Sequence, residues 1–160
     1  MVAIASAYQR PEPWARQVFE ARAHPRVALP ACGLLQVSNP GRFVDRALPF
    51  FITDILENCA DNYLPGDGTE RVPELADPLV FMEQAGAPDR PLPAFFLPVG
   101  TRDPLQDDTR RMESALSRLG VPCQARYYKG ELHAFHALIW RQAARDCWKE
   151  MMAFTARYLD

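Results

Sequence analysis

Short strand-like runs alternate with longer amphipathic stretches, and this alternation constrains the fold more than any other feature of the sequence. Buried strands are predicted over three segments, VALPACG (27–33), AFFLPVG (94–100) and CQARYY (123–128). Helices are predicted where apolar residues recur at helical spacing, over 2–21 (broken near Pro11 and Pro13), 43–63, 78–85, 104–119 and 137–159. Strands that alternate with helices form a parallel sheet covered on both faces. The predicted fold class is therefore α/β, a three-layer α/β/α arrangement with parallel strands.

Prolines and glycines mark where these elements end or are interrupted. Pro49 interrupts the second helical stretch, and Gly120 stands where a glycine commonly terminates a helix. Residues 64–78 contain two glycines and three prolines and are predicted to form a loop. Pro30 and Pro98 lie inside two of the predicted strands, near their carboxyl ends. Because proline cannot donate to a strand ladder, both argue against regular central strands there.

Length, charge and cysteine content exclude several classes of protein. A chain of 160 residues can bury a core without metal or disulfide staples. With 18 basic and 20 acidic residues and no basic block, it carries no footprint for nucleic acid. The longest uncharged run, 27–41, is too short and too polar to span a membrane. Four cysteines without a CxxC pair predict buried free thiols, and hence a soluble, cytoplasmic protein.

Titratable residues follow the second and third predicted strands. Asp103 comes shortly after the strand that ends at Gly100, and His133 comes shortly after the strand that ends at Tyr128. Carboxyl ends of neighbouring parallel strands meet at one rim of the sheet, where α/β folds place their sites. There a carboxylate can accept the Nδ1–H of a histidine and fix its tautomer, which is part of a nucleophilic triad. The residues alone leave alternatives open: Asp103 as a helix N-cap before Pro104, and His133 as a structural loop residue.

Several motifs appear in one order over residues 92–138, namely GTRDPLQD, LGVP, YYKG and LHAF. In this order they resemble the C-terminal half of the hormone-sensitive-lipase-like esterases, a branch of the α/β-hydrolases; the remaining residues are similar by element order only. The resemblance implies the last three strands of that fold with their flanking helices. It implies Asp103 as the acid of a catalytic triad and His133 as its general base. It also implies hydrolysis of a small-molecule carboxylic ester, with no cofactor and no metal.

The nucleophile that this family uses has no counterpart in the sequence. The family's serine lies in a Gly-x-Ser-x-Gly turn before the acid. None of the four serines has glycines at those positions: Ser6, Ser38, Ser114 and Ser117. Cys32, in PACGL, lacks the first glycine of a cysteine version, and no HGG-type segment for an oxyanion hole is present. Because residues 1–8 look like the continuation of the helix after the family's serine, we expect residues 1–160 to be a single, partial domain that is inactive alone.

A partial sheet has a consequence for partners. The strand predicted over 27–33 would have an open apolar edge, which is a site for pairing with another chain. We therefore expect that face to be covered, either by a second copy in a homo-oligomer or by an N-terminal partner chain. The alternative is a non-catalytic truncated module that acts through oligomerisation or partner binding. A third hypothesis is a flavodoxin-like binding domain unrelated to hydrolases, in which Asp103 and His133 do not touch.

Other candidate residues have ordinary structural interpretations that we prefer. His133 and His136 have the spacing of a metal-binding pair, but no third ligand is evident, so His136 is interpreted as a packing or supporting residue. Asp107 and Asp108 lie in the first turn of a predicted helix, where they interact favourably with its dipole. Core packing is preferred over an acyl pocket for four aromatic residues, Phe43, Phe50, Phe51 and Tyr63.

Overall fold

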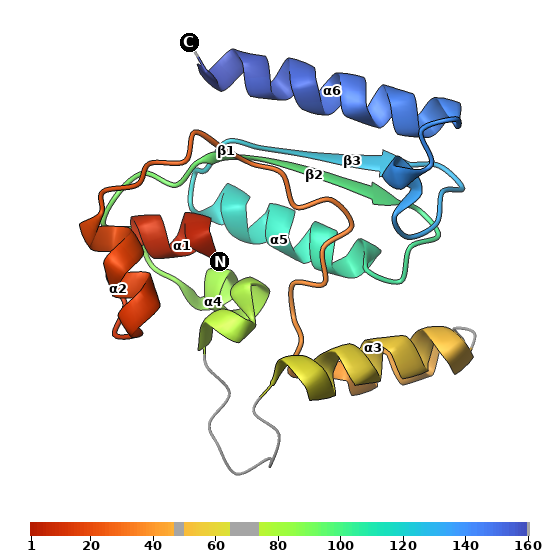
Figure 1. Ribbon diagram of the computed structural model, residues 1–160, viewed down its shortest axis with the longest axis horizontal. Coiled ribbons are helices and arrows are strands. Elements are labelled where there is room, and N and C mark those ends of the chain that lie inside the picture. Colours follow the sequence, from red (N-terminus) through yellow and green to blue (C-terminus); the bar gives the residue numbers. More distant parts are fainter. Residues whose placement is uncertain (47–49, 65–73, 160) are drawn as a thin grey trace.

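The computed structural model describes residues 1–46, 50–64 and 74–159. Its sheet has three parallel strands in the order β1-β2-β3, which are Val27–Ala28, Ala94–Gly100 and Cys123–Tyr128. The α-helices of the described residues are α1 (Val2–Ala7), α2 (Pro13–Glu20), α3 (Phe50–Tyr63), α4 (Pro78–Gln84), α5 (Gln106–Arg118) and α6 (Gln142–Leu159). The sheet lies between α6 on one face and α5 on the other (Figure 1). The predicted α/β fold with a parallel sheet flanked by helices is confirmed.

Strand β2 forms the centre of the molecule, and all seven of its residues are buried. Side chains of a strand alternate between its two faces. Phe95 and Leu97 pack into one apolar cluster with residues of α1, α4 and α5. Phe96 points to the other face, where its ring lies 5.4 Å from that of Phe154 in α6. The continuous apolar run at 94–100 therefore reflects a strand that is covered on both faces.

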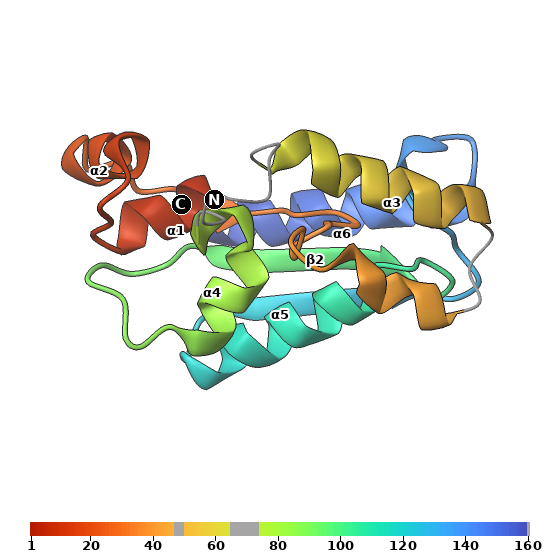
Figure 2. The ribbon, with the colours of Figure 1, turned by 90° about the horizontal axis from the view of Figure 1, so that it is seen from below.

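Helices α4 and α5 lie side by side, as Figure 2 shows. Arg118, the last residue of α5, donates to the carbonyl oxygens of Met82 and Ala85 at the end of α4, each at 2.9 Å. A cation at this position neutralises the partial negative charge at a helix C-terminus. The two helices are thereby joined at their ends as well as along their apolar faces.

The strand predicted over 27–33 is shorter in the structure, and the expectation about Pro98 was wrong. Only Val27 and Ala28 pair with β2, and the chain then turns at Cys32, whose φ is +49°. Pro98 lies inside the regular central strand, opposite Arg126. Its carbonyl accepts the Cys32 N–H at 3.0 Å. In a strand, the N–H and the C=O of one residue point toward the same neighbouring segment. An N–H at position 98 would therefore point toward the residues after Ala28, where β1 has already ended.

Several other boundaries follow the sequence pattern with small shifts. The helix predicted over 104–119 is α5, and Gly120 follows it with φ +67°, as expected for a terminating glycine. The helix predicted to begin at 137 begins at Gln142 instead, after a 3₁₀ turn at Phe135–Ala137. The stretch 43–63 divides into a 3₁₀ helix, Pro40–Arg46, and α3. Pro49 and residues 65–73 of the predicted loop lie outside the described residues.

The structure also bears on the expectations about thiols and membranes. All four cysteines are free, and Cys32 and Cys147 are buried, as predicted. The prediction was wrong for Cys59, which α3 exposes to solvent, and Cys123 is half-buried. Among the helices of the described residues, none is long and apolar enough to cross a bilayer.

Candidate active site

The loops that follow β2 and β3 are held together by backbone hydrogen bonds at the carboxyl end of the sheet. The Thr101 N–H donates to the Tyr128 carbonyl at 3.0 Å, and the Arg102 N–H donates to the Glu131 carbonyl at 3.0 Å. In the opposite direction, the Gly130 N–H donates to Thr101 Oγ1 at 2.8 Å. The relative position of the two loops is therefore set by backbone groups and the Thr101 hydroxyl, and it does not depend on the side chains of Asp103 and His133.

A glycine at the end of β2 permits this close approach. A Cβ added to Gly100 would lie 2.2 Å from the carbonyl oxygen of Glu131. A Cβ atom and a non-bonded carbonyl oxygen do not approach so closely, so any side chain at position 100 would push the loops apart. Gly100 therefore brings together the two loops that carry Asp103 and His133.

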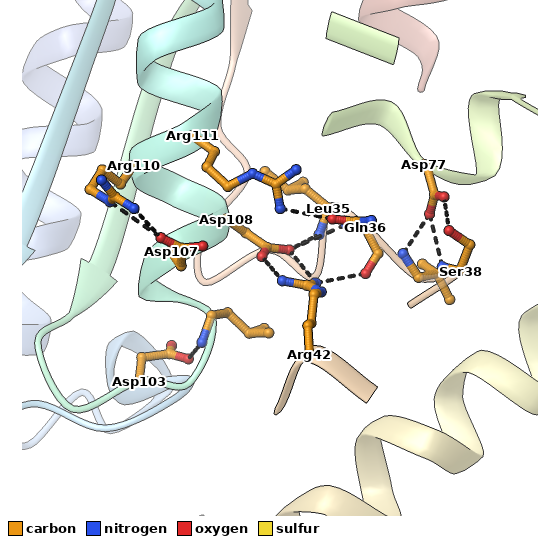
Figure 3. A network of polar contacts seen from close by, with 12 residues as sticks. Leu35, Gln36, Ser38, Arg42, Asp77, Asp103, Asp107, Asp108, Arg110 and Arg111 are labelled. Carbon is orange, nitrogen blue, oxygen red and sulfur yellow. Dashed lines mark hydrogen bonds and ion pairs between the residues drawn. The ribbon is translucent and has the colours of Figure 1, made fainter. Parts of the chain in front are cut away.

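Asp103 and His133 meet at this edge of the sheet. His133 Nδ1 lies 3.1 Å from Asp103 Oδ2 and 3.3 Å from Oδ1. The Asp103 side chain is fully buried, whereas the His133 side chain is 51% exposed. The Leu105 N–H also donates to Asp103 Oδ1, at 2.8 Å (Figure 3). Asp103 thus stabilises the turn before α5, as a capping residue would, and at the same time holds one edge of the imidazole.

This contact changes the acid–base behaviour of the histidine. The hydrogen bond to Asp103 raises the pKa of His133 above its usual value, and this effect exceeds the opposing effect of burial. A buried carboxylate favours the positively charged imidazolium and so makes the ring a better proton acceptor. The pair has the arrangement that a general base and its orienting carboxylate require.

Cys32 lies beside this pair, which the sequence pattern did not indicate. Its Sγ, one Asp103 carboxylate oxygen and one ring nitrogen of His133 all lie within 4.8 Å of one another. Burial, reinforced by the negative charge of Asp103, raises the pKa of the Cys32 thiol to about 12. The thiol is therefore protonated at neutral pH and is poorly suited to be a nucleophile. Its position follows from the hydrogen bond to Pro98, a contact that no local motif records.

The sulfur of Cys32 also approaches the second histidine of the loop. His136 Nδ1 lies 3.8 Å from Cys32 Sγ. The His136 ring is packed near the rings of Phe135 and Trp148, and its carbonyl accepts the Trp148 Nε1–H at 2.9 Å. Burial lowers the pKa of His136. His136 therefore packs as expected. The sequence showed no third metal ligand beside His133 and His136, and the structure places the Cys32 thiol near both.

Asp108 holds the segment that follows Cys32. It is fully buried, accepts the Leu35 N–H at 2.8 Å and the Gln36 N–H at 3.2 Å, and pairs with the Arg42 guanidinium (Figure 3). The interpretation of Asp108 as a carboxylate that simply favours the helix dipole was therefore incomplete. Asp107, next to it, pairs instead with the exposed Arg110. Nothing in the sequence distinguishes these adjacent aspartates, because the partners of Asp108 lie about seventy residues earlier.

A second buried carboxylate holds the same segment a little further on. Asp77 accepts the Val37 N–H at 2.6 Å and the Ser38 N–H at 3.0 Å, and it also accepts the Ser38 hydroxyl (Figure 3). Backbone donors that belong to no sheet or helix are satisfied in this way. Together, Asp77 and Asp108 fix the path of residues 33–42 and therefore the end of the turn that carries Cys32.

The remaining candidates lie outside this cluster. Phe43 is buried against Leu56 and Leu105, in agreement with core packing, whereas Tyr63 is exposed. The side chains of Phe50 and Phe51 lie outside the described residues. The serine hydroxyls are engaged or placed elsewhere: Ser6 donates to the Ala3 carbonyl, Ser38 donates to Asp77, and Ser114 and Ser117 line a polar depression beside Arg118.

Comparison with known proteins identifies the family. A sequence model of the alpha/beta hydrolase fold matches residues 15–137. The chain therefore belongs to the α/β-hydrolase family, and the hypothesis of an unrelated flavodoxin-like domain was wrong. Among curated proteins, none matches the sequence.

Solved structures of esterases and lipases share the fold. A hormone-sensitive lipase from a metagenome library has a TM-score of 0.67 and 17% identity, over 91% of this chain and 48% of its own. Carboxyl esterase 2 from the mycorrhizal fungus Tuber melanosporum has a TM-score of 0.67 and 15% identity, over 89% of this chain and 47% of the esterase. Esterase E25 has a TM-score of 0.63 and 20% identity, over 89% of this chain and 43% of the esterase. The chain spans less than half the length of each of these structures.

Proposed function

We propose that this chain is the acid–base part of a carboxylic-ester hydrolase, with the nucleophilic serine supplied from outside these 160 residues. Residues 1–160 then form a single, partial α/β-hydrolase domain, and the substrate is a small-molecule ester. One observation carries the proposal: a buried carboxylate, Asp103, lies 3.1 Å from Nδ1 of His133 at adjoining strand ends of an α/β-hydrolase fold.

The proposed chemistry begins with His133. Asp103 accepts the Nδ1–H and so leaves Nε2 as the basic nitrogen. Nε2 takes the serine proton as the serine oxygen attacks the ester carbonyl, and the imidazolium that forms is stabilised by Asp103. It then returns the proton to the leaving alcohol, and water repeats the cycle on the acyl-serine. The raised pKa of His133 supports the first step, because it strengthens the ring as a proton acceptor.

An apolar groove supports the idea that another segment completes the sheet. It has a volume of about 410 Å³ and lies between the start of α1, strand β1 and α4, with Val2, Val27 and Met82 among its lining residues. In the described sheet β1 pairs on one side only, with β2. An apolar groove next to an open parallel edge is suited to a further strand and helix. We propose that the segment carrying the serine, on a partner chain or a longer polypeptide, binds here.

A fluorophosphonate probe, which reacts with activated serines, tests the proposal. The chain is isolated from its native source together with whatever polypeptide carries the rest of the fold, treated with the probe, and measured by intact-mass spectrometry. We expect an adduct on the completing polypeptide and no adduct on the segment 1–160. We expect His133→Ala to abolish the adduct, because the serine then has no general base.

His24→Ala is the matched control, since His24 is an exposed histidine in the segment that joins α2 to β1. It should leave labelling unchanged. No adduct on any polypeptide would overturn the proposal and favour a non-catalytic module. An adduct on residues 1–160 would contradict an external nucleophile, and labelling that survives His133→Ala would contradict the role of His133.

A further inference from the structure

Three metal-ligand types from three different segments converge at the carboxyl end of the sheet. Cys32 follows β1, Asp103 follows β2 and His133 follows β3. Their ligand atoms all lie within 4.8 Å of one another, and the Cys32 and Asp103 side chains are buried. The segments after the three strands thus bring a thiol, a carboxylate and an imidazole close to one another.

A fourth ligand type lies beside the thiol of this cluster. His136 Nδ1 lies 3.8 Å from Cys32 Sγ, and its loop is tied to the β2 loop by the backbone bonds described above. Zinc bonds of about 2.0–2.3 Å place neighbouring ligand atoms roughly 3.3–3.8 Å apart in a tetrahedron. Two separations are close to those spacings: 3.1 Å between Asp103 Oδ2 and His133 Nδ1, and 3.8 Å between Cys32 Sγ and His136 Nδ1. Other separations in the cluster extend to 4.8 Å, so its side chains must draw together by about 1 Å to surround one ion.

We propose that Cys32, Asp103, His133 and His136 bind a thiophilic divalent cation of the Zn²⁺ type, and that the ion blocks the acid–base pair. A site with one thiolate, two imidazoles and one carboxylate suits zinc and its analogues Co²⁺ and Cd²⁺, and not Mg²⁺ or Ca²⁺, which take oxygen ligands. On binding, the ion replaces the thiol proton of Cys32, which passes to solvent. It enters past His133, whose side chain is half exposed.

The ion and the proposed catalysis exclude one another for a physical reason. A metal ion bound to His133 Nδ1 displaces the proton that Asp103 accepts there, and the neutral ring then carries its proton on Nε2, the nitrogen that the proposed base needs free. Asp103 cannot orient the ring while it also coordinates the ion. Coordination itself needs only the side chains of this chain. The metal site therefore stands or fails independently of the proposed esterase activity, and its test is spectroscopic.

Titration of the metal-free 160-residue chain with CoCl₂ tests the site directly. Tetrahedral cobalt bound to a thiolate gives intense visible bands and a near-ultraviolet sulfur-to-metal charge-transfer band. We expect these bands to saturate at one ion per chain and to disappear on addition of ZnCl₂, but not of MgCl₂. The charge-transfer band should be absent in Cys32→Ser and unchanged in Cys59→Ser, whose thiol is free but exposed on α3.

A second variant keeps the test decisive if Cys32→Ser fails to fold. The half-exposed side chain of His133 can be removed with little effect on the core, so His133→Ala should remain folded by circular dichroism. We expect it to weaken cobalt binding about ten-fold or more, while His24→Ala has no effect. A charge-transfer band that persists in Cys32→Ser, an affinity unchanged in His133→Ala, or spectra that never saturate would each overturn the proposal.

Discussion

Two buried aspartates five residues apart, Asp103 and Asp108, show how similar side chains serve different purposes in this fold. Asp108 faces the guanidinium of Arg42 and two backbone N–H groups. Arginine is always charged in proteins, so this arrangement is the same at every physiological pH. Asp103 faces one backbone N–H and the imidazole of His133, which is half exposed and can titrate.

The comparison distinguishes a carboxylate that holds the backbone in place from one that can support proton transfer. A buried carboxylate with permanent partners stabilises one arrangement of the chain, here the segment after β1. A buried carboxylate with a titratable partner can stabilise two protonation states of that partner, which is what proton transfer needs. Both aspartates are buried, so burial alone does not distinguish them. Their partners do, because Arg42 keeps its charge and His133 can titrate.

The largest effect is expected from changing Asp103 in the completed enzyme. Asp103→Asn preserves the shape of the side chain but replaces a carboxylate oxygen with an amide, so it no longer enforces the required tautomer of His133. Fluorophosphonate labelling of the completing polypeptide should slow by about 10⁴-fold. Asp107→Asn, in the first turn of α5 and outside the Asp103–His133 pair, should label at the unchanged rate. Equal rates for the two variants would remove Asp103 from the mechanism.

Loss of Asp108 should instead reduce stability. Asp108→Ala leaves Arg42 as an unpaired, largely buried cation and orphans the Leu35 and Gln36 N–H groups. Breaking a buried pair in this way costs about 3–5 kcal/mol. The measurement is the free energy of unfolding in denaturant. Asp107→Ala, which breaks the pair with the exposed Arg110, should cost less than about 1 kcal/mol. A similar small loss in both would show that the buried network contributes little.

Position 100 tests how closely the two site loops must approach. In Gly100→Ala the new Cβ would meet the Glu131 carbonyl, which is backbone and can yield only if the loop moves. Overpacking of this kind costs about 1–3 kcal/mol. It should also lengthen the contact between Asp103 and His133, detectable as a lower His133 pKa by NMR. The control is Gly86→Ala, since a Cβ there meets nothing within 4 Å. Unaltered stability in Gly100→Ala would contradict the close approach.

The smallest effect is the pH dependence contributed by His133. Because its folded-state pKa is raised, the ion pair with Asp103 contributes stability that is fully present below about pH 6.5, the unfolded value. That contribution is lost as the pH rises through the raised pKa. For a half-exposed group we expect less than about 1 kcal/mol. Unfolding free energies of the wild type and His133→Ala should therefore converge at high pH. If the difference in unfolding free energy between the two proteins grew with pH, the folded-state pKa of His133 would be lowered and not raised.

Much of the fold follows from local pattern. The run at 94–100 predicts β2 with the observed bounds, and Gly120 marks the end of α5 as expected. The Asp103–His133 contact was also anticipated, because each residue lies just after a strand and parallel strands bring such positions to one edge. Pro98 was misjudged, since whether a proline is tolerated depends on where the neighbouring strand ends. That information lies in the pairing and is absent from the strand's own sequence.

The sequence by itself determined which elements form and which residues stand at their ends, because periodicity and turn chemistry act over a few residues. Only the tertiary structure decided which residues of the other segments lie beside those ends. It placed Cys32 beside Asp103 and His133, and His136 beside Cys32 Sγ. It also buried Asp108 against Arg42, 66 positions away, while Asp107, partly exposed, pairs with the exposed Arg110. Such contacts depend on the path of the whole chain and on the need to pair every buried charge, and no short stretch of residues encodes them.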